Sequence, residues 1–306
     1  MDKIFLVVNP HSGEKNGRAF VQKLEPILSK KNILTHMYET TGNDNFKAIT
    51  EKALEKGFKT VLIVGGDGTI SEYVNQIADL TIRPSIILLP LGTTNNLARA
   101  LHTELDDEKL LNKVGKFNFI EKQIDVGKMN DRYFVSTVSV GAIPETAWKT
   151  DDDIKEKLGP FAYLIKGLDT LTNQKNFDVT MVLDGIEQAY YDVFLIVIGL
   201  SNSVFGIPTF FNEATIDDGR FHLFILKNDS LLNEVGSIAQ QIFDETNSPE
   251  KDRDNESMVY TTSFKEGRMY SKTPFSFTVD GEKGSEFPVN LVVYPNHLTF
   301  LVPEKD

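Results

Sequence analysis

A glycine-rich turn at residues 65–69 is the stretch of this 306-residue chain whose residue types most directly suggest chemistry. An apolar, β-branched run at residues 61–64 ends in Gly-Gly-Asp-Gly-Thr, which predicts a buried strand followed by a tight turn. Glycines let a backbone approach a ligand closely, and N–H groups at the start of a helix attract phosphate. Asp67 is the one carboxylate of this turn, and it suits a phosphate site if it acts through a metal ion. The alternative is a structural corner in which Asp67 only caps the following helix.

Alternating strands and helices in the first part of the chain must position this turn. Strands are predicted at residues 4–8, 33–38, 61–64 and 86–89, and helices at residues 17–28, 45–56, 70–78 and 97–101. The alternation predicts a parallel sheet with helices on both faces, whose ligands bind beyond the carboxyl ends of the strands. Four small, polar or glycine-rich loops follow the strands at that edge, at residues 9–13, 40–41, 65–69 and 92–96. Together these loops predict a nucleotide or polyphosphate site.

The second part of the chain has a different predicted secondary-structure pattern, with strands that are not separated by regular helices. Strands are predicted at residues 123–128, 133–138, 177–183, 190–198, 221–226, 275–279, 289–294 and 298–302. Helical insertions are expected at residues 155–171 and 231–243, and a polar loop at residues 245–256. We therefore expect an α/β domain with a parallel sheet at residues 1–122 and a β-sandwich domain at residues 123–290. Residues 291–306 would form a C-terminal segment that returns toward the first domain.

Composition excludes several classes of function. The chain has no cysteine, which excludes a disulfide framework, a thiolate metal site and a cysteine nucleophile. Its formal net charge of −12 opposes binding to nucleic acid and stable electrostatic docking on an anionic membrane. We see neither a signal-peptide pattern nor an apolar run long enough to cross a bilayer, so we expect a cytoplasmic protein.

Three common nucleotide motifs are absent from the sequence. The chain contains no Walker pattern, no Gly-x-Gly-x-x-Gly fingerprint and none of the His-Arg-Asp and Asp-Phe-Gly loops of protein kinases. If the loops at the sheet edge bind a nucleotide, they do so by another arrangement.

An ordered set of short motifs extends over nearly the whole chain. Its members are Asn9-Pro10-x-Ser12-Gly13, Gly65-Gly66-Asp67-Gly68-Thr69 with Glu72 and Asn75, Pro90-x-Gly92-Thr93-x-Asn95, and Asp280-Gly281-Glu282. Further matches are Asp125-Val126-Gly127-Lys128, Gly159-Pro160-Phe161-Ala162-Tyr163, Gly199-Leu200-x-Asn202 and Asp217-Asp218-Gly219. In this order they resemble the bacterial soluble diacylglycerol kinase family, whose relatives include the sphingosine and ceramide kinases. The Gly-Gly-Asp-Gly motif alone is less specific, because NAD kinases and phosphofructokinases also use it.

The resemblance implies ATP-dependent phosphorylation of a lipid hydroxyl with Mg²⁺, most specifically of diacylglycerol to phosphatidic acid. It implies an ATP-binding α/β domain, a β-sandwich domain for the lipid substrate and an active site in the cleft between them. The residues expected around ATP are Asn9, Pro10, His11, Ser12, Gly13, Thr40, Gly66, Asp67, Gly68, Thr69, Glu72 and Thr93. The lipid would be met transiently at the membrane surface, and family members are often homodimers.

The resemblance also implies roles for carboxylates outside the glycine-rich turn. Asp280 and Glu282 would form the general-base pair, and Thr215, Asp218 and the carbonyl of Arg220 would hold a structural Mg²⁺. Asp67, Asp125 and the residue at position 96 would form a water network around the catalytic Mg²⁺. From the residues alone, Asp280-Gly281 and Asp217-Asp218-Gly219 are interpreted as hairpin turns in preference to functional sites, because Asp-Gly is a common turn dipeptide.

One departure from the family pattern bears on activity. Asn96 stands where the family usually has aspartate, so one formal charge of the expected metal network is missing. Ser136, Ser139 and Val140 also stand where asparagine and glycine are common. Two alternatives to a diacylglycerol kinase therefore stay open. One is a kinase of another hydroxylated lipid or a polyol, and the other is a nucleotide- or lipid-binding relative without turnover.

Overall fold

The computed structural model describes residues 2–12, 17–103, 105–141, 176–207, 210–227 and 259–304. The chain divides into two compact units. The first unit comprises Met1–Val126, Arg132–Val135 and Tyr294–Asp306, and the second comprises Gly127–Asp131 and Ser136–Val293. Residues 132–135, which the sequence analysis placed in the second domain, pack with the first unit.

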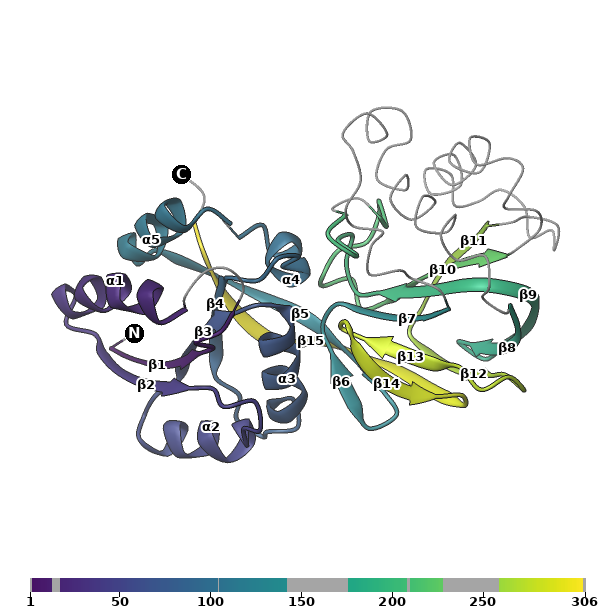
Figure 1. Cartoon of the computed structure of the whole chain (residues 1–306), viewed down its shortest axis with the longest axis horizontal. Helices are drawn as coiled ribbons and strands as arrows, with labels where there is room; N and C mark the ends of the chain where they lie inside the picture. Colours follow the sequence, from purple (N-terminus) through teal and green to yellow (C-terminus); the bar gives the residue numbers. More distant parts are fainter. Residues whose placement is uncertain are drawn as a thin grey trace. The chain divides into compact units, whose positions relative to one another are not determined.

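The first unit is built on a parallel sheet with the strand order β4-β3-β1-β2. These strands are β1 (Lys3–Val8), β2 (Leu34–Glu39), β3 (Thr60–Gly65) and β4 (Ser85–Pro90). The C-terminal part of β15 (Val289–Pro303) joins the β4 side in parallel, with Phe300 opposite Ile86. Its helices are α1 (Gly17–Lys30), α2 (Phe46–Glu55), α3 (Asp67–Ile77), α4 (Asn96–Ala100) and α5 (Asp107–Lys116). Figure 1 shows α1 and α5 on one face of the sheet and α2 and α3 on the other.

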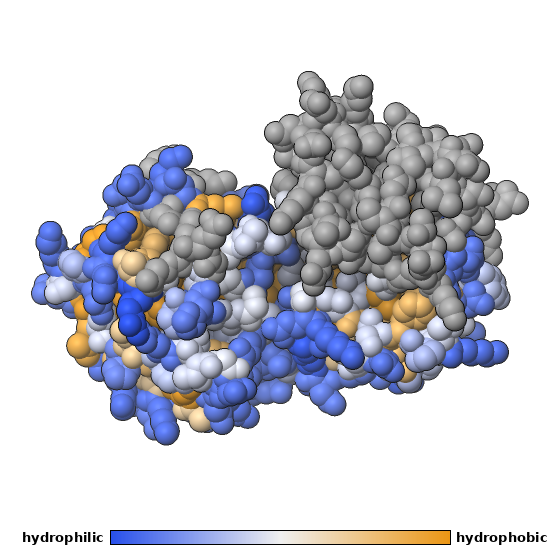
Figure 2. All heavy atoms as spheres, viewed as in Figure 1, coloured by the Kyte–Doolittle hydropathy of each residue, from blue (hydrophilic) through white to orange (hydrophobic). Residues whose placement is uncertain are grey.

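Apolar side chains on both faces of this sheet explain why its strands are nearly continuous hydrophobic runs. On the α1 and α5 face, alternate residues of the strands pack with Phe20, Leu24, Leu28, Leu110 and Val114. On the opposite face, the ring of Phe46 in α2 meets that of Tyr73 in α3 edge-on at 5.3 Å. Each fully buried leucine or phenylalanine contributes roughly 1.5–3 kcal/mol. Hydrophilic residues cover most of the visible outer face of this unit in Figure 2, as expected for a two-sided core.

The second unit consists of β-strands arranged around the long strand β9 (Ile186–Gly199), whose two halves pair with different sets of strands. Its other strands are β7 (Thr137–Gly141), β8 (Phe177–Leu183), β10 (Phe221–Lys227), β11 (Val259–Phe264), β12 (Glu266–Tyr270), β13 (Ser276–Val279) and β14 (Glu282–Glu286). The C-terminal half of β9 lies between β7 and β10, and β13 and β14 extend the β7 side. The N-terminal half of β9 pairs with β8, which leads through β12 to β15. Asp192, at a positive φ of 54°, lies where β9 changes from one set of partners to the other.

These observations confirm the predicted fold class, an α/β unit followed by a strand-rich unit. The expected strand at residues 133–138 is instead two strands, β6 (Arg132–Phe134) and β7. The expected strands at residues 289–294 and 298–302 are one strand, β15, which continues through Pro295 and Asn296. Asn296 has a positive φ of 50°, so the apparent turn signal marks an irregularity within the strand.

Several predictions were incomplete or fall outside the described residues. Helix α5 and strands β11, β12 and β14 were not predicted, and β5 (Phe119–Met129) begins earlier than expected. The expected helices at residues 155–171 and 231–243 and the loop at 245–256 lie outside the part of the chain that the structure describes. Among the described residues, no helix is long and apolar enough to span a bilayer.

Candidate active site

The glycine-rich turn joins the end of β3 to the start of α3 and lies directly against the turn after β4. Gly66 is the N-cap of α3 in an extended conformation, and Asp67 is the first helical residue. A Cβ atom on Gly92 would lie 2.7 Å from the Cα of Gly66, so the two backbones touch and a side chain would separate them. The N–H of Leu91 donates to the carbonyl of Gly65 at 2.9 Å. Glycine is therefore needed at both positions, and Asp67 is not the N-cap residue that the structural alternative required.

Asn95 shapes the turn after β4. It adopts a left-handed conformation with φ 52°, and its side chain is buried. Its Oδ1 accepts from the N–H of Gly92 at 3.0 Å, and its Nδ2 donates to the Gly92 carbonyl at 2.7 Å. Asn95 occupies the N-cap position of α4, and Asn96 is the first residue of that helix. This turn leaves Thr93 exposed, where it is accessible to a ligand.

Asn9 connects the turn after β1 to the glycine-rich turn. Its Nδ2 donates to the Oγ1 of Thr69 at 2.9 Å, and its N–H donates to the carbonyl of Val64 at 2.9 Å. Its Oδ1 accepts from the N–H of His11 at 2.9 Å, and its carbonyl accepts from the Ser12 hydroxyl at 3.1 Å. The structure thus brings Asn9, Ser12 and Thr69 together. Pro10 is partly exposed and His11 is exposed, while Gly13 lies outside the described residues.

The turn after β2 contains a residue that the sequence analysis missed. Thr40, partly exposed, donates its N–H to the carbonyl of Val8 at 2.9 Å, which fixes the start of this turn beside β1. The following turn closes on the buried carboxylate of Asp44, which accepts hydrogen bonds from Tyr38, Thr41 and Gly42. Burial alone would raise the pKa of Asp44, but these hydrogen bonds outweigh it and lower the pKa. The signal in the sequence was an aspartate at turn spacing, three residues after Thr41.

The acidic residues expected around ATP or the metal differ in their burial. Asp67 and Glu72 are partly exposed on α3, which suits contact with a solvated ligand. Asp125 on β5 is fully buried, and its Oδ1 accepts from the N–H of Asn296 at 2.8 Å. Asn75 of α3, a member of the sequence motif, accepts from the N–H of Tyr133 at 2.9 Å. Asn75 therefore has a structural contact that joins α3 to β6.

Asp280 lies in the two-residue hairpin turn between β13 and β14, which is the turn that the Asp-Gly dipeptide predicted. Asp280 and Gly281 have positive φ values of 49° and 88°, which is the geometry of a type I′ turn. Unlike a solvated turn residue, however, Asp280 is buried, and its Oδ1 accepts from the N–H groups of Ser136 and Thr137, both at 2.9 Å. Its own N–H donates to the Thr137 carbonyl at 2.7 Å. The carboxylate is rigidly oriented, whereas Glu282 at the start of β14 is exposed.

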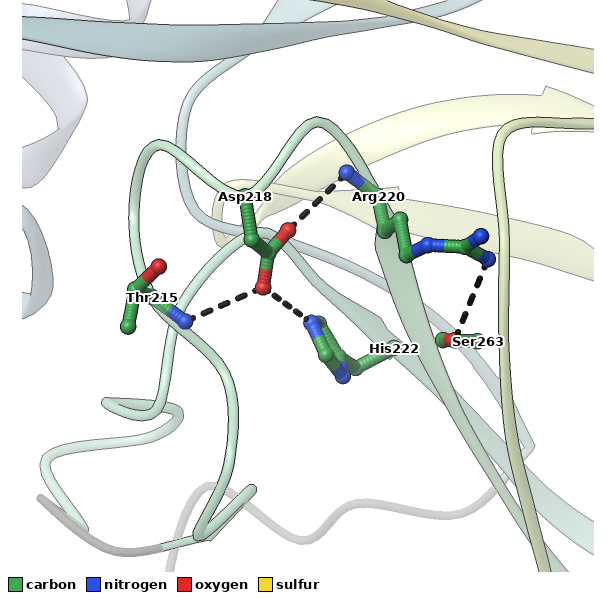
Figure 3. A network of polar contacts seen from close by, with 5 residues as sticks. All are labelled: Thr215, Asp218, Arg220, His222 and Ser263. Carbon is green, nitrogen blue, oxygen red and sulfur yellow. Dashed lines mark hydrogen bonds and ion pairs between the residues drawn. The ribbon is translucent and has the colours of Figure 1, made fainter.

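The loop before β10, expected to hold a structural Mg²⁺, is closed by hydrogen bonds to Asp218 (Figure 3). The carboxylate of Asp218 accepts from the N–H of Thr215 at 3.1 Å and from the N–H of Arg220 at 2.9 Å. Its Oδ2 also lies 2.8 Å from the Nε2 of His222. Burial opposes the charged form of Asp218, but the contact with His222 and the backbone donors lower its pKa.

This donor set fits a magnesium ion only with water and backbone carbonyls as the remaining ligands. Within the described ranges, no group of three or more histidine, cysteine, aspartate or glutamate side chains could hold a metal. The roles of Thr215, Asp218 and Arg220 as ligands stay predictions.

A parallel α/β unit with a glycine-rich turn and a helix N-terminus at its strand ends is typical of proteins that bind phosphate groups. The profile of the diacylglycerol kinase catalytic domain matches residues 3–129 of this chain. A diacylglycerol kinase of Staphylococcus carnosus is 30% identical over 300 residues, which cover 98% of this chain and 94% of the relative. A diacylglycerol kinase of Staphylococcus epidermidis is 31% identical over 302 residues, which cover 98% and 92%. The chain belongs to the diacylglycerol kinase family and is a lipid kinase.

Solved structures agree with this fold. A putative diacylglycerol kinase from Bacillus anthracis superimposes with a TM-score of 0.77 at 23% sequence identity, covering 98% of this chain and 97% of that one. A second structure of a diacylglycerol kinase from the same organism gives a TM-score of 0.72 at 21% identity. The two-unit architecture is therefore retained although most residues differ.

Proposed function

We propose that this protein transfers the γ-phosphate of ATP to a lipid hydroxyl with the help of Mg²⁺, and that diacylglycerol is the substrate and phosphatidic acid the product. The observation that carries the proposal is the contact between Gly66 and Gly92 beside the N-terminus of α3. It leaves side-chain-free backbone next to Asp67, which is what a polyphosphate requires. Family membership supplies the lipid as the acceptor.

The first unit would bind the nucleotide. The turn at residues 66–69 would receive phosphate oxygens at its backbone N–H groups, and Asn9 would keep the Thr69 hydroxyl in a fixed direction. Asp67 would hold Mg²⁺ directly or through its water, and Asp125, which is fully buried, would accept hydrogen bonds in the same network. When bound, Mg²⁺ supplies neutralisation of the phosphate charge. The remaining catalytic requirement is alignment, which dominates phosphoryl transfer.

The second unit would activate the lipid hydroxyl. The hydroxyl oxygen forms a bond to the γ-phosphorus while the bond from that phosphorus to the bridging oxygen of ADP breaks. The hydroxyl proton passes to the carboxylate of Asp280, which the N–H groups of Ser136 and Thr137 hold in place. Glu282, which is exposed at the start of β14, would be the second member of the general-base pair and would contribute less than Asp280.

We propose further that the protein acts in the cytoplasm and meets its lipid only transiently at the membrane surface. A formal net charge of −12 disfavours lasting attachment to an anionic leaflet. A homodimer, the arrangement that the family resemblance implies, belongs to the same proposal and is tested by light scattering of the purified chain.

A labelling assay tests the proposed reaction and its substrate. The protein is incubated with γ-labelled ATP, Mg²⁺ and extracted membrane lipids, and labelled products are separated by chromatography. We expect one labelled lipid that comigrates with phosphatidic acid. A different labelled lipid would overturn diacylglycerol as the substrate, and ATP binding without any labelled lipid would identify a relative that has lost turnover.

A further inference from the structure

The turn between β2 and α2 is organised around the carboxylate of Asp44, which is 7% exposed. The carboxylate accepts from the Tyr38 hydroxyl at 2.6 Å and from the Thr41 hydroxyl at 2.7 Å. It also accepts from the N–H groups of Thr41 at 2.9 Å and Gly42 at 3.1 Å. One buried side chain therefore fixes the shape of the whole turn. Hydrogen bonds to an ionised carboxylate are stronger than neutral ones, and here they come from three different residues of the turn and the strand before it.

Gln76 of α3 holds the same turn from the other side. Its Nε2 donates to the carbonyl of Asp44 at 2.9 Å, and its Oε1 accepts from the N–H of Phe46 at 2.7 Å. The contact is backed by Tyr73, which packs against Phe46 and shares a hydrogen bond of 3.0 Å with the Thr50 hydroxyl. The side-chain amide thus joins α3 to the first residue of α2.

Helix α3 consequently connects two turns. Its first residue, Asp67, belongs to the glycine-rich turn, and Gln76 is nine residues further on, about 14 Å along the helix at 1.5 Å per residue. The turn closed by Asp44 begins at Thr40, whose N–H donates to the carbonyl of Val8. The residue after Val8 is Asn9, which contacts Thr69 of the glycine-rich turn. The turn at residues 40–44 therefore extends from the edge of the glycine-rich turn alongside α3.

The chemistry of this turn suits a neutral ligand group. The N–H groups of Thr41 and Gly42, which would otherwise attract an anion, already donate to Asp44. The carboxylate of Asp44 is ionised at neutral pH, because its hydrogen bonds lower its pKa, and it would repel a phosphate. These features favour an uncharged sugar or base over a phosphate at the turn closed by Asp44.

We propose that Asp44 and Gln76 are positioning residues that fix the turn at residues 40–44 to receive the nucleoside part of the nucleotide. This inference rests on the proposed binding of ATP by the first unit. It adds two residues that contact no phosphate and act only through the shape of the turn. Their loss should weaken binding of the nucleoside part and leave the transfer step unchanged at saturating ATP.

The test compares Asp44→Ala and Gln76→Ala with the matched control Asn45→Ala. Asn45 is adjacent in the chain and caps α2 by accepting from the N–H of Ala48 at 3.0 Å, so its loss weakens the helix without breaking the Asp44 contacts. For each variant we would measure the melting temperature, KM for ATP, kcat, and the affinities for ATP and inorganic tripolyphosphate by calorimetry. Asp44→Asn serves as the milder variant if Asp44→Ala does not fold.

We expect KM for ATP to rise about tenfold in Asp44→Ala and Gln76→Ala, while kcat stays within about twofold of wild type. ATP affinity should fall while tripolyphosphate affinity does not, and Asn45→Ala should lower only the melting temperature. An unchanged KM for ATP in folded variants would overturn this inference and leave the proposed function standing. An equal loss of tripolyphosphate affinity would overturn the assignment to the nucleoside. Wild-type protein that binds no ATP would overturn both this inference and the proposed function.

Discussion

Asp67 is the residue on which the nucleotide half of the site depends. It is the first residue of α3 and is partly exposed beside the touching backbones of Gly66 and Gly92. Asp67→Asn keeps the shape of the side chain but removes its charge. We expect turnover to fall by about 10²–10³-fold, because charge stabilisation of the transferring phosphate would be lost. Steady-state kinetics with a melting curve checks this, and a folded variant with near-normal turnover would exclude the role.

Asn96 is a position where the sequence analysis expects this chain to depart from the family pattern. Asn95 holds the N-cap position of α4 and Asn96 is the first helical residue, so Asn96 is not the cap of this helix. An amide offers a weaker contact to metal-bound water than a carboxylate, because a charge-assisted hydrogen bond is roughly twice as strong as a neutral one.

Asn96→Asp should therefore lower the Mg²⁺ concentration needed for half-maximal activity. A Mg²⁺ titration of both proteins, with a melting curve for each, checks this expectation. If the titrations superimpose and only the melting temperature changes, the charge at position 96 acts on the helix and not on the metal.

At the level of the elements, the contact between the turns after β3 and β4 sets the shape of the site. In Gly92→Ala the new Cβ would lie 2.7 Å from the Gly66 Cα and 2.8 Å from the Asn95 Oδ1. We expect a loss of roughly 1–3 kcal/mol in stability, as for other overpacked sites, together with a loss of ATP affinity. Urea unfolding and calorimetry measure both.

Gly115→Ala in α5 is the matched control for that change. Its Cβ would meet only the side chain of Ile27, with the Cγ2 at 3.2 Å and the Cδ1 at 4.0 Å. Alanine favours a helix over glycine by up to about 1 kcal/mol, so stability should hold or rise and ATP affinity should stay the same. Equal effects of the two substitutions would show that the contact at Gly92 has no special importance.

His297 joins β15 to the end of α3 and gives the first unit a sensitivity to acid. Its Nε2 is 2.9 Å from the Ala78 carbonyl, and its ring stacks on that of Tyr133 at 6.2 Å. Burial lowers the pKa of His297, although the Ala78 carbonyl opposes the shift. The unfolded chain therefore binds this proton at a higher pH than the folded chain does. Stability is unaffected above the unfolded pKa of about 6.5 and falls as the pH drops from there toward the folded pKa.

We expect the free energy of unfolding to fall between pH 7.5 and about 5.5, and to fall less in His297→Gln. His11→Gln, at an exposed position, is the matched control. Urea unfolding at the two pH values measures the free energy of unfolding. An identical pH dependence in wild type and His297→Gln would contradict the assignment.

Elements whose own residues show an apolar run, a periodicity or a turn motif could be predicted best from the sequence. The run at residues 61–64 ends in glycines, so β3 and a helix after the turn could be predicted from it, although α3 begins at Asp67 and not at the expected residue 70. Strand β14 reads Glu-Lys-Gly-Ser-Glu and is mostly exposed, so it has no apolar periodicity, and only its pairing with β13 makes it a strand. Asp44 and Gln76 were missed because their importance comes from contacts between separate elements.

On the scale of the whole molecule, the two units carry different parts of the proposed reaction. The first contains the glycine-rich turn, and the second contains the buried carboxylate of Asp280. Family membership explains why both are present in one chain. In the proposed reaction, ATP bound through the first unit therefore phosphorylates a lipid hydroxyl whose proton Asp280 removes.

The most direct test measures label transfer from γ-labelled ATP to diacylglycerol by wild type, Asp280→Asn and the control Glu282→Gln, with ATP affinity measured in parallel. We predict labelled phosphatidic acid from wild type, a loss of about 10²–10⁴-fold in Asp280→Asn with unchanged ATP affinity, and a smaller loss in Glu282→Gln. The proposed reaction would be contradicted if wild type labelled no lipid, or if Asp280→Asn retained the full rate of transfer.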